Sequence, residues 1–233
     1  MRWAVVTFPG SNCDMDCVDQ LERVLGQEVV QVWHADTTLP EVDCVVLPGG
    51  FSYGDYLRAG SIARFSPIMQ AVIAFAESGG VVLGICNGFQ ILLEAGLLPG
   101  AMQRNRDLSF ICENVWLRTE VGSDALTCAL PEEKRVVRIP IAHMEGNYTA
   151  SPELLRELNQ NQQVLFRYCT EDGEVTPESN PNGAMENIAG IRNRNGNVFG
   201  MMPHPERASE AILGGTDGAL LFQSLIQYME ARA

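Results

Sequence analysis

The chain has 233 residues, of which 46% are hydrophobic, seven cysteines and a formal net charge of −13. This acidic charge excludes nucleic acid and anionic membranes as main partners, and no apolar run approaches the roughly 20 residues of a membrane-spanning helix. An odd number of scattered cysteines and a strand-like N-terminus without signal-peptide features predict a reduced, cytoplasmic protein, and the length suits one α/β domain over residues 1–233.

Strand-like and helical segments alternate through the first half of the chain. The apolar patterns predict strands and helices in the order β-α-β-β-α-β-α. The strands are Trp3–Phe8, Val29–His34, Cys44–Leu47 and Val81–Ile85, and the helices are Asp14–Leu25, Pro67–Glu77 and Phe89–Ala95. Because parallel strands need crossover connections and are usually covered on both faces, this alternation indicates an open parallel sheet between two helical layers.

The second half of the chain is richer in strands. Its predicted elements are the strands Phe110–Val121, Val136–Ile141 and Val164–Tyr168, a polar loop Glu171–Asn187, a hairpin Ile188–Met202 turning at Asn195-Gly196, and a closing helix Gly218–Ala231. The predicted fold class is therefore α/β with three layers. A mostly parallel open sheet has helices on both faces and an antiparallel, strand-rich extension.

Cys86 stands where a predicted strand turns abruptly into a predicted helix. Gly84 and Gly88 flank it, which is typical of an elbow that displays a nucleophile. Such crowding holds the reactive residue in a strained backbone conformation and leaves the following N–H, here that of Asn87, to stabilise an oxyanion. Cys86 is therefore the candidate nucleophile. Four cysteines in plain apolar contexts are instead expected to be buried, inert thiols, namely Cys44, Cys112, Cys128 and Cys169.

His204 and Glu206 lie in the segment Pro203–Glu206. Proline favours an extended conformation for the residue before it, and side chains two apart on an extended segment share a face. Glu206 is therefore predicted to orient the imidazole of His204, whose other nitrogen would face the thiol of Cys86 in a catalytic triad. His143 is the rival base, and we favour His204 because the prolines fix its segment.

The glycine-rich segment Pro48–Asp55 follows the third predicted strand. Ligands of open α/β sheets bind at this carboxyl edge. Glycine lets the backbone approach a small ligand closely. We expect an N–H near Gly50 to be the second oxyanion donor beside that of Asn87.

Motifs for a metal or nucleotide cofactor are missing from the sequence. Cys13 and Cys17 are four residues apart on a predicted helix, but no second ligand pair accompanies them. The segment Pro48–Asp55 lacks the lysine of a P-loop and the spacing of a dinucleotide fingerprint. No cofactor and no metal are therefore predicted in this chain.

These motifs together resemble those of class I, triad-type glutamine amidotransferases. The segment Gly84–Gln90 matches the nucleophile motif of that family, and His204–Glu206 matches its base and orienting acid. Within the class, the longer strings resemble the stand-alone glutaminase subunits of phosphoribosylformylglycinamidine synthases, and the resemblance extends from end to end. These strings are Phe8–Asp14, Pro48–Asp55 and Met201–Arg207.

The resemblance implies hydrolysis of L-glutamine to glutamate and ammonia through a thioester on Cys86, with His204 as acid and base and Glu206 as its orienting group. It also implies a set of glutamine-binding residues, in which Ser109 and Phe110 act through their backbone. The set is Gly50, Phe51, Asn87, Gln90, Ser109 and Phe110.

Partners are implied in the same way. Ammonia would pass to a separate synthetase subunit, which uses ATP and magnesium to convert formylglycinamide ribonucleotide to formylglycinamidine ribonucleotide in purine biosynthesis, assisted by a small bridging subunit. Making an amidine from an amide requires an activated oxygen, and no ATP-binding motif is found in this sequence. A surface for the synthetase is expected near the active-site mouth, including the loop His143–Tyr148.

Two other functions fit the residues alone. One is a stand-alone cysteine hydrolase or peptidase of related architecture, which would need no His-Pro-Glu pair. The other is a non-catalytic scaffold subunit in which Cys86 is only structural. An intact thiol, imidazole and carboxylate favour the glutaminase over both.

Overall fold

The structure is a computed structural model that describes residues 1–121, 124–131 and 133–232. These residues form two compact units, Met1–Pro99 with Arg192–Gly200, and Gly100–Ile191 with Met201–Ala233. The chain therefore leaves the first unit once and returns to it through one short segment. The single domain over residues 1–233 stays a prediction.

The first unit is built on a sheet with parallel strand pairs. Its strand order is β2-β1-β3-β4-β11, and the pairs β1 with β2, β1 with β3, and β3 with β4 are parallel. All residues of β3 and β4 are buried, as expected for strands covered on both faces. The strands are β1 Arg2–Thr7, β2 Glu28–Trp33, β3 Cys44–Leu47, β4 Val81–Ile85 and β11 Val198–Met201.

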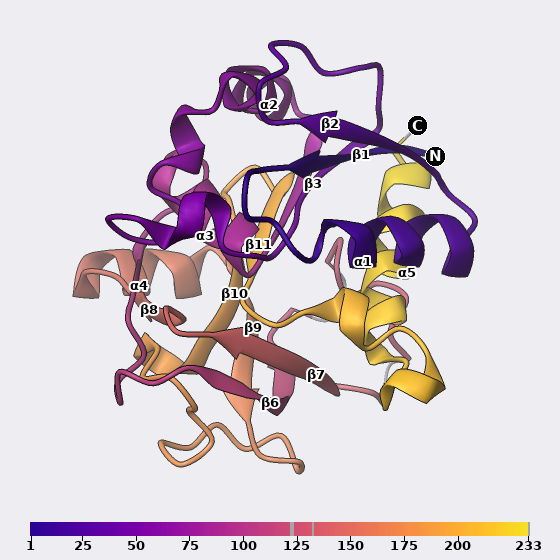
Figure 1. The fold of residues 1–233 in the computed structure, drawn as a ribbon. Coiled ribbons are helices and arrows are strands. Elements are labelled where there is room, and N and C mark those ends of the chain that lie inside the picture. Colours follow the sequence, from indigo (N-terminus) through magenta and orange to yellow (C-terminus); the bar gives the residue numbers. More distant parts are fainter. Residues whose placement is uncertain (122–123, 132, 233) are drawn as a thin grey trace. The chain divides into compact units, whose positions relative to one another are not determined.

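Three helices accompany this sheet, α1 Asp14–Asp19, α2 Pro67–Glu77 and α3 Asn87–Glu94. Helix α1 connects β1 to β2, and α2 connects β3 to β4, which lies in the opposite direction along the sheet. Because both crossovers are right-handed, the two helices cover opposite faces of the sheet (Figure 1). The predicted helix Asp14–Leu25 is α-helical only to Asp19. It continues as a π-helical turn over Gln20–Val24, where the N–H of Leu25 bonds the carbonyl of Gln20.

The second unit contains an antiparallel sheet with strand order β10-β9-β6-β7. Together with the parallel sheet of the first unit, it confirms the predicted fold class. The turn of the predicted hairpin is present, since the N–H of Asn193 bonds the carbonyl of Val198 around Gly196, which has a φ of +71°. The elements are β6 Ile111–Thr119, β7 Val136–His143, β9 Val164–Cys169, β10 Ile188–Arg192 and α5 Asp217–Glu230.

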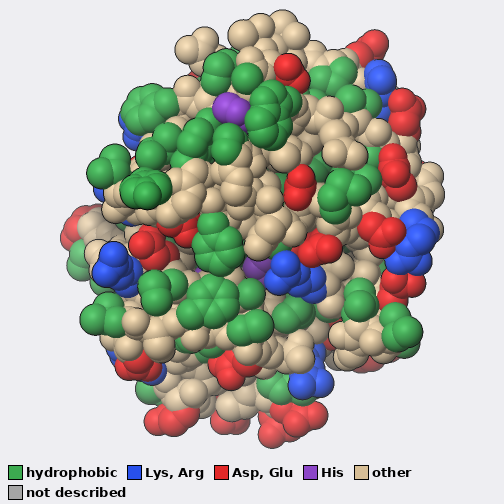
Figure 2. Space-filling view, viewed as in Figure 1, with side chains coloured by type: hydrophobic (Ala, Val, Ile, Leu, Met, Phe, Trp, Pro, Cys, Tyr) green, Lys and Arg blue, Asp and Glu red, His purple; other side chains and the backbone are tan. Residues whose placement is uncertain are grey.

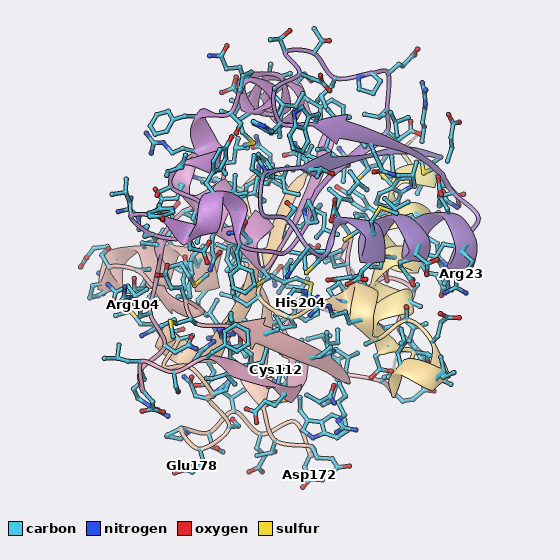
Figure 3. The ribbon with its side chains drawn as sticks, viewed as in Figure 1. Arg23, Arg104, Cys112, Asp172, Glu178 and His204 are labelled. Atoms are coloured by element: carbon cyan, nitrogen blue, oxygen red, sulfur yellow. The ribbon has the colours of Figure 1, made fainter. Side chains whose placement is uncertain are left out.

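Three elements of the second unit are additional to the predicted ones. A two-stranded sheet pairs β5 Ala101–Gln103 with β8 Asn147–Thr149. Helix α4 spans Pro152–Gln160, and the hydroxyl of Ser151 caps it by accepting a hydrogen bond from the N–H of Leu154. The loop predicted over Glu171–Asn187 is largely irregular, and Figure 3 shows its acidic residues Asp172 and Glu178 exposed at its tip.

The surface carries charges of both signs. Figure 2 shows acidic and basic side chains interspersed over the viewed face. The net charge of −13 is therefore not gathered there into one acidic patch. Among the residues that the structure describes, no helix combines the length and the apolar character needed to cross a membrane.

Candidate active site

Cys86 occupies the bend between β4 and α3 in the first unit. Its backbone lies at φ +50° and ψ −103°, and its side chain is buried. A residue with a side chain rarely adopts a positive φ, and strain of this kind costs about 1–3 kcal/mol and concentrates at functional sites. The predicted strand, sharp turn and helix are therefore present, with the thiol at the strained position.

The glycines beside Cys86 are required by close packing. A Cβ atom on Gly84 would lie 2.7 Å from the backbone carbonyl of Gly88, and a Cβ on Gly88 would collide with the carbonyl oxygen of Leu47. Because the obstructing atoms are backbone, a rotamer change cannot relieve either clash. The tight approach of α3 to β3 and β4 thus fixes the bend that carries Cys86.

Asn87 is the first residue of α3, and its N–H belongs to the first turn, where backbone donors have no acceptor within the helix. Its buried side chain links two segments. Oδ1 accepts a hydrogen bond from the N–H of Ser52 at 3.1 Å, and Nδ2 donates to Oε1 of Gln90 at 2.9 Å. Asn87 therefore ties the glycine-rich segment to the helix behind the nucleophile.

Gly50 holds that segment in a conformation that favours glycine. Its φ is +142°, and a Cβ would lie 2.7 Å from the Cα of Ser11. The next N–H, that of Phe51, donates to the carbonyl of Gly10 at 3.0 Å. Because this donor is engaged, the N–H of Gly50 is the better oxyanion candidate in the segment.

Gln90 and Phe51, both expected to bind glutamine, are placed differently. Gln90 is 4% exposed and accepts the hydrogen bond from Asn87. Phe51 is 42% exposed at the surface. Gln90 therefore supports the side chain of Asn87, and its contact with substrate stays a prediction, as does that of Phe51.

His204 and Glu206 meet in the second unit. Nδ1 of His204 lies 2.6 Å from Oε1 of Glu206, and both side chains are buried. A carboxylate can only accept, so Nδ1 carries the hydrogen and Nε2 keeps its lone pair for another proton. The predicted pairing of base and orienting acid is present. Figure 3 labels His204 in the segment between β11 and α5.

The local backbone that forms this pair differs from the extended segment expected. His204 is extended, at φ −102° and ψ 87°, but Pro205–Arg207 form a 3₁₀ turn in which the N–H of Arg207 bonds the carbonyl of His204. The start of α5 packs against this turn, because a Cβ on Gly218 would collide with the carbonyl of Pro205. Tertiary packing, rather than strand geometry, brings the carboxylate to the ring.

His143, the rival base, has different surroundings at the end of β7. It is 3% exposed, and its Nδ1 lies 3.0 Å from Oδ1 of Asn105. Burial, and then the charge of His204, lower the pKa of His143 to about 4. An amide orients this ring whereas a carboxylate orients His204, so His143 is the poorer candidate for a base that must carry a proton.

Four other cysteines were expected to be buried, inert thiols, but two of them, Cys112 and Cys128, are exposed, and none of the seven cysteines forms a disulfide. Desolvation raises the pKa of the thiols of Cys44 and Cys128, and it raises that of Cys169 to about 11. Since the thiolate is the nucleophile, these three thiols are poorly suited to attack an amide.

Ser109 and Phe110 precede β6 in the second unit, and both are exposed. The carbonyl of Ser109 accepts a hydrogen bond from Nδ2 of Asn105 at 2.8 Å. Sequence reasoning missed Asn105, as it missed the hydrogen bond from Ser52 to Asn87. A buried asparagine has no distinctive sequence pattern, so no local signal marked it.

Comparisons with known proteins agree on one family. Residues 1–216 match the family described as CobB/CobQ-like glutamine amidotransferase domain. The subunit PurQ of phosphoribosylformylglycinamidine synthase from Moorella thermoacetica is 60% identical over 230 residues, covering 99% of this chain and 97% of the relative. The PurQ subunit from Acaryochloris marina is 58% identical over 232 residues, covering 100% and 98%.

Solved structures give the same result. A chain in the structure of PurLQS from Thermotoga maritima has a TM-score of 0.85 and 42% identity, with 98% of both chains covered. A glutamine amidotransferase from Thermotoga maritima has a TM-score of 0.60 at 16% identity, with 98% of this chain and 97% of that chain covered. The second likeness supports the fold alone.

Proposed function

Because this chain belongs to the CobB/CobQ-like glutamine amidotransferase family and is a glutaminase subunit of phosphoribosylformylglycinamidine synthase in purine biosynthesis, we propose that Cys86 is the nucleophile that cleaves glutamine. The observation that carries this assignment is the strained backbone of Cys86 at φ +50° in a glycine-flanked bend.

His204 moves the protons in the proposed mechanism. Its Nε2 takes the proton of the Cys86 thiol, and the sulfur attacks the side-chain amide carbon of L-glutamine. The imidazolium then gives that proton to the leaving nitrogen, so ammonia departs and a γ-glutamyl thioester remains. His204 next removes a proton from water, which attacks the thioester and yields glutamate, and the same proton returns to the sulfur.

Glu206 and two backbone donors complete the proposed machinery. The contact of 2.6 Å between Glu206 and Nδ1 supports a role in keeping the ring of His204 in the reactive tautomer and stabilising its charged form. The N–H groups of Gly50 and Asn87 would hold the oxyanion of each tetrahedral intermediate. Gly50 and the first turn of α3 both belong to the first unit, which fixes their backbones by close packing.

The ammonia needs a partner that can use it. We propose that this chain needs no cofactor of its own and supplies a synthetase subunit that uses ATP and magnesium, together with a small bridging subunit. The relative in the PurLQS structure from Thermotoga maritima supports such an assembly. A cytoplasmic location is proposed with it, supported by seven cysteines that form no disulfide.

A surface for the synthetase is proposed on the segment Phe51–Phe65. It exposes large apolar side chains, among them Tyr56, Phe65 and Leu57, which is 91% exposed. Exposed apolar groups that gather in one segment are typical of interaction sites. The loop His143–Tyr148, expected to take part, exposes Met144, whereas His143 and Tyr148 themselves are buried.

Replacement of the nucleophile tests the proposal. With the partner subunits present, Cys86→Ala is expected to abolish glutamate release from glutamine, while Cys112→Ala, which removes an exposed thiol, leaves it unchanged. Glutamate release that survives in Cys86→Ala contradicts the assignment. If the chain were a stand-alone peptidase, it would cleave peptides with little preference for glutamine. If it were a scaffold, the unaltered chain would not cleave glutamine at all.

A further inference from the structure

Asn105 lies in the segment that begins at Arg104, which Figure 3 labels, and its side chain is 0% exposed. All four of its hydrogen-bonding positions are used. Nδ2 donates to the carbonyls of Ser109 at 2.8 Å and His143 at 2.9 Å. Oδ1 accepts from the N–H of Gly146 at 2.9 Å and faces Nδ1 of His143 at 3.0 Å. A single amide thus joins its own loop to the turn after β7.

These partners fix both the amide and the imidazole. Two carbonyls can only accept, so the NH₂ group of Asn105 must face them, and Oδ1 must face the donors. His143 therefore carries its hydrogen on Nδ1. A Cβ on Gly146 would collide with the ring of His143, so the turn at this position closes against the imidazole. His143 is a neutral structural donor in this network.

The same network sets the backbone that leads into β6. The N–H of Leu108 bonds the backbone carbonyl of Asn105 at 2.9 Å, and Leu108 has a φ of +52°. This positive φ turns the chain, and the bond from Nδ2 of Asn105 then holds the carbonyl of Ser109. Ser109 and Phe110 are exposed, so a ligand can reach this segment, and the hydrogen bond from Asn105 holds the carbonyl of Ser109.

We propose that Asn105, with His143 as its donor, is a positioning residue for glutamine. It holds the Ser109–Phe110 backbone in the geometry that binds the α-amino and α-carboxylate groups of the substrate. This inference rests on the proposed function, which assigns that backbone to the amino-acid end of glutamine. All four hydrogen-bonding positions of the Asn105 amide are used within the second unit, so its loss is expected to change recognition and to leave the chemical step intact.

The informative substitution is Asn105→Asp. It keeps the size and one oxygen of the side chain, but it replaces the donor of two hydrogen bonds with an acceptor that faces two carbonyls. The KM for glutamine is expected to rise about tenfold or more with kcat little changed, because a lost bond to a buried group is worth about 1–3 kcal/mol. Asn197→Asp is the matched control, since Asn197 is also a buried asparagine whose Nδ2 donates to two backbone carbonyls, those of Ala76 and Gly80, but it belongs to the first unit.

Two electrophiles separate positioning from a general loss of structure. In the full chain with its partner subunits, a glutamine analogue that carries a reactive ketone needs the amino-acid subsite, whereas iodoacetamide does not. Asn105→Asp is expected to slow labelling of Cys86 by the analogue about tenfold and to leave labelling by iodoacetamide unchanged. The proposal is overturned if the analogue labels Cys86 at the same rate in Asn105→Asp and in the unaltered chain. It is also overturned if the substitution slows labelling by the analogue and by iodoacetamide equally.

Two substitutions at His143 test the same proposal even if Asn105→Asp does not fold. His143→Asn places an amide N–H where Nδ1 donates to Asn105 and is expected to keep the KM near that of the unaltered chain, whereas His143→Leu removes the donor and raises the KM. Equal KM values for the two variants contradict the inference. Failure of the analogue to label Cys86 in the unaltered chain is a separate result that rejects the proposed function itself.

Discussion

Nδ1 of His204 and Oε1 of Glu206 lie 2.6 Å apart in a buried contact. This distance is short for a nitrogen and an oxygen, as expected when one partner is charged. A 3₁₀ turn at Pro205–Arg207, seated against the start of α5, maintains it. His204 and Glu206, the proposed base and its orienting acid, are therefore preorganised within one unit.

Glu206→Gln is expected to lower kcat for glutamine hydrolysis by about 10²–10⁴-fold, because an amide cannot stabilise the imidazolium and can bond the wrong tautomer. Steady-state glutamate release with the partner subunits measures this change. Glu178→Gln, which alters an exposed carboxylate in the loop before β10, is the control with unchanged kcat. A kcat in Glu206→Gln within twofold of the control rejects the role of Glu206.

His143 makes stability depend on pH. Its pKa is about 4 in the folded chain, against 6.5 for the free group. Between these values the unfolded chain binds a proton that the folded chain does not, so stability is full above pH 6.5 and is lost as pH falls toward 4. The loss amounts to roughly 3 kcal/mol. Urea unfolding across this range measures it, and His143→Gln should flatten the curve. An unchanged slope in His143→Gln rules out His143 as the source.

Gly88→Ala tests the packing behind the nucleophile. The new Cβ collides with the carbonyl oxygen of Leu47, so α3 must move away from β3. We expect a loss of stability above about 2 kcal/mol, together with slower labelling of Cys86. Gly26→Ala is the matched control, since Gly26 has a φ of +65° with nothing within 4 Å of the added atom. Its cost is about 1 kcal/mol from backbone strain alone. Equal losses for the two variants contradict the packing explanation.

Leu57→Asp tests the proposed surface for the synthetase. Leu57 is 91% exposed, so the substitution leaves folding intact and places a charge on the apolar segment Phe51–Phe65. Affinity for the partner subunits, measured by calorimetry, is expected to fall about tenfold or more. Ile212→Asp changes a side chain that is 90% exposed in the second unit and serves as the control. If Ile212→Asp loses more affinity for the partner subunits than Leu57→Asp does, the interface does not lie on the segment Phe51–Phe65.

Local sequence signals predicted the strands and the bend. The buried strands β3 and β4 have continuous apolar runs, and glycines on either side of Cys86 marked the elbow. Those glycines permit the close packing of α3 against β3 and β4 that fixes the strained bend at Cys86. Proline beside His204 marked the second site segment, although the carboxylate reaches the ring through a turn that depends on α5.

Features that depend on distant partners had no such signal. Asn105 joins its own loop to the end of β7 and the following turn through one amide, and nothing near it in sequence distinguishes it from a surface asparagine. The hydrogen bond between Ser52 and Asn87 likewise joins the glycine-rich segment to helix α3, which is distant in sequence. Helix α4 was detectable, since Ser151 and Pro152 form a start signal, but its short, polar sequence made the helical pattern easy to miss.

Labelling with a glutamine-mimicking electrophile, followed by peptide mass mapping, tests the central claim most directly. The full chain with its partner subunits is expected to carry one label, on Cys86, and excess glutamine should protect against it. His204→Ala should slow this labelling, because the thiol then loses its base. Labelling at another cysteine, such as the exposed Cys112, with Cys86 unmodified would contradict the assignment of the nucleophile.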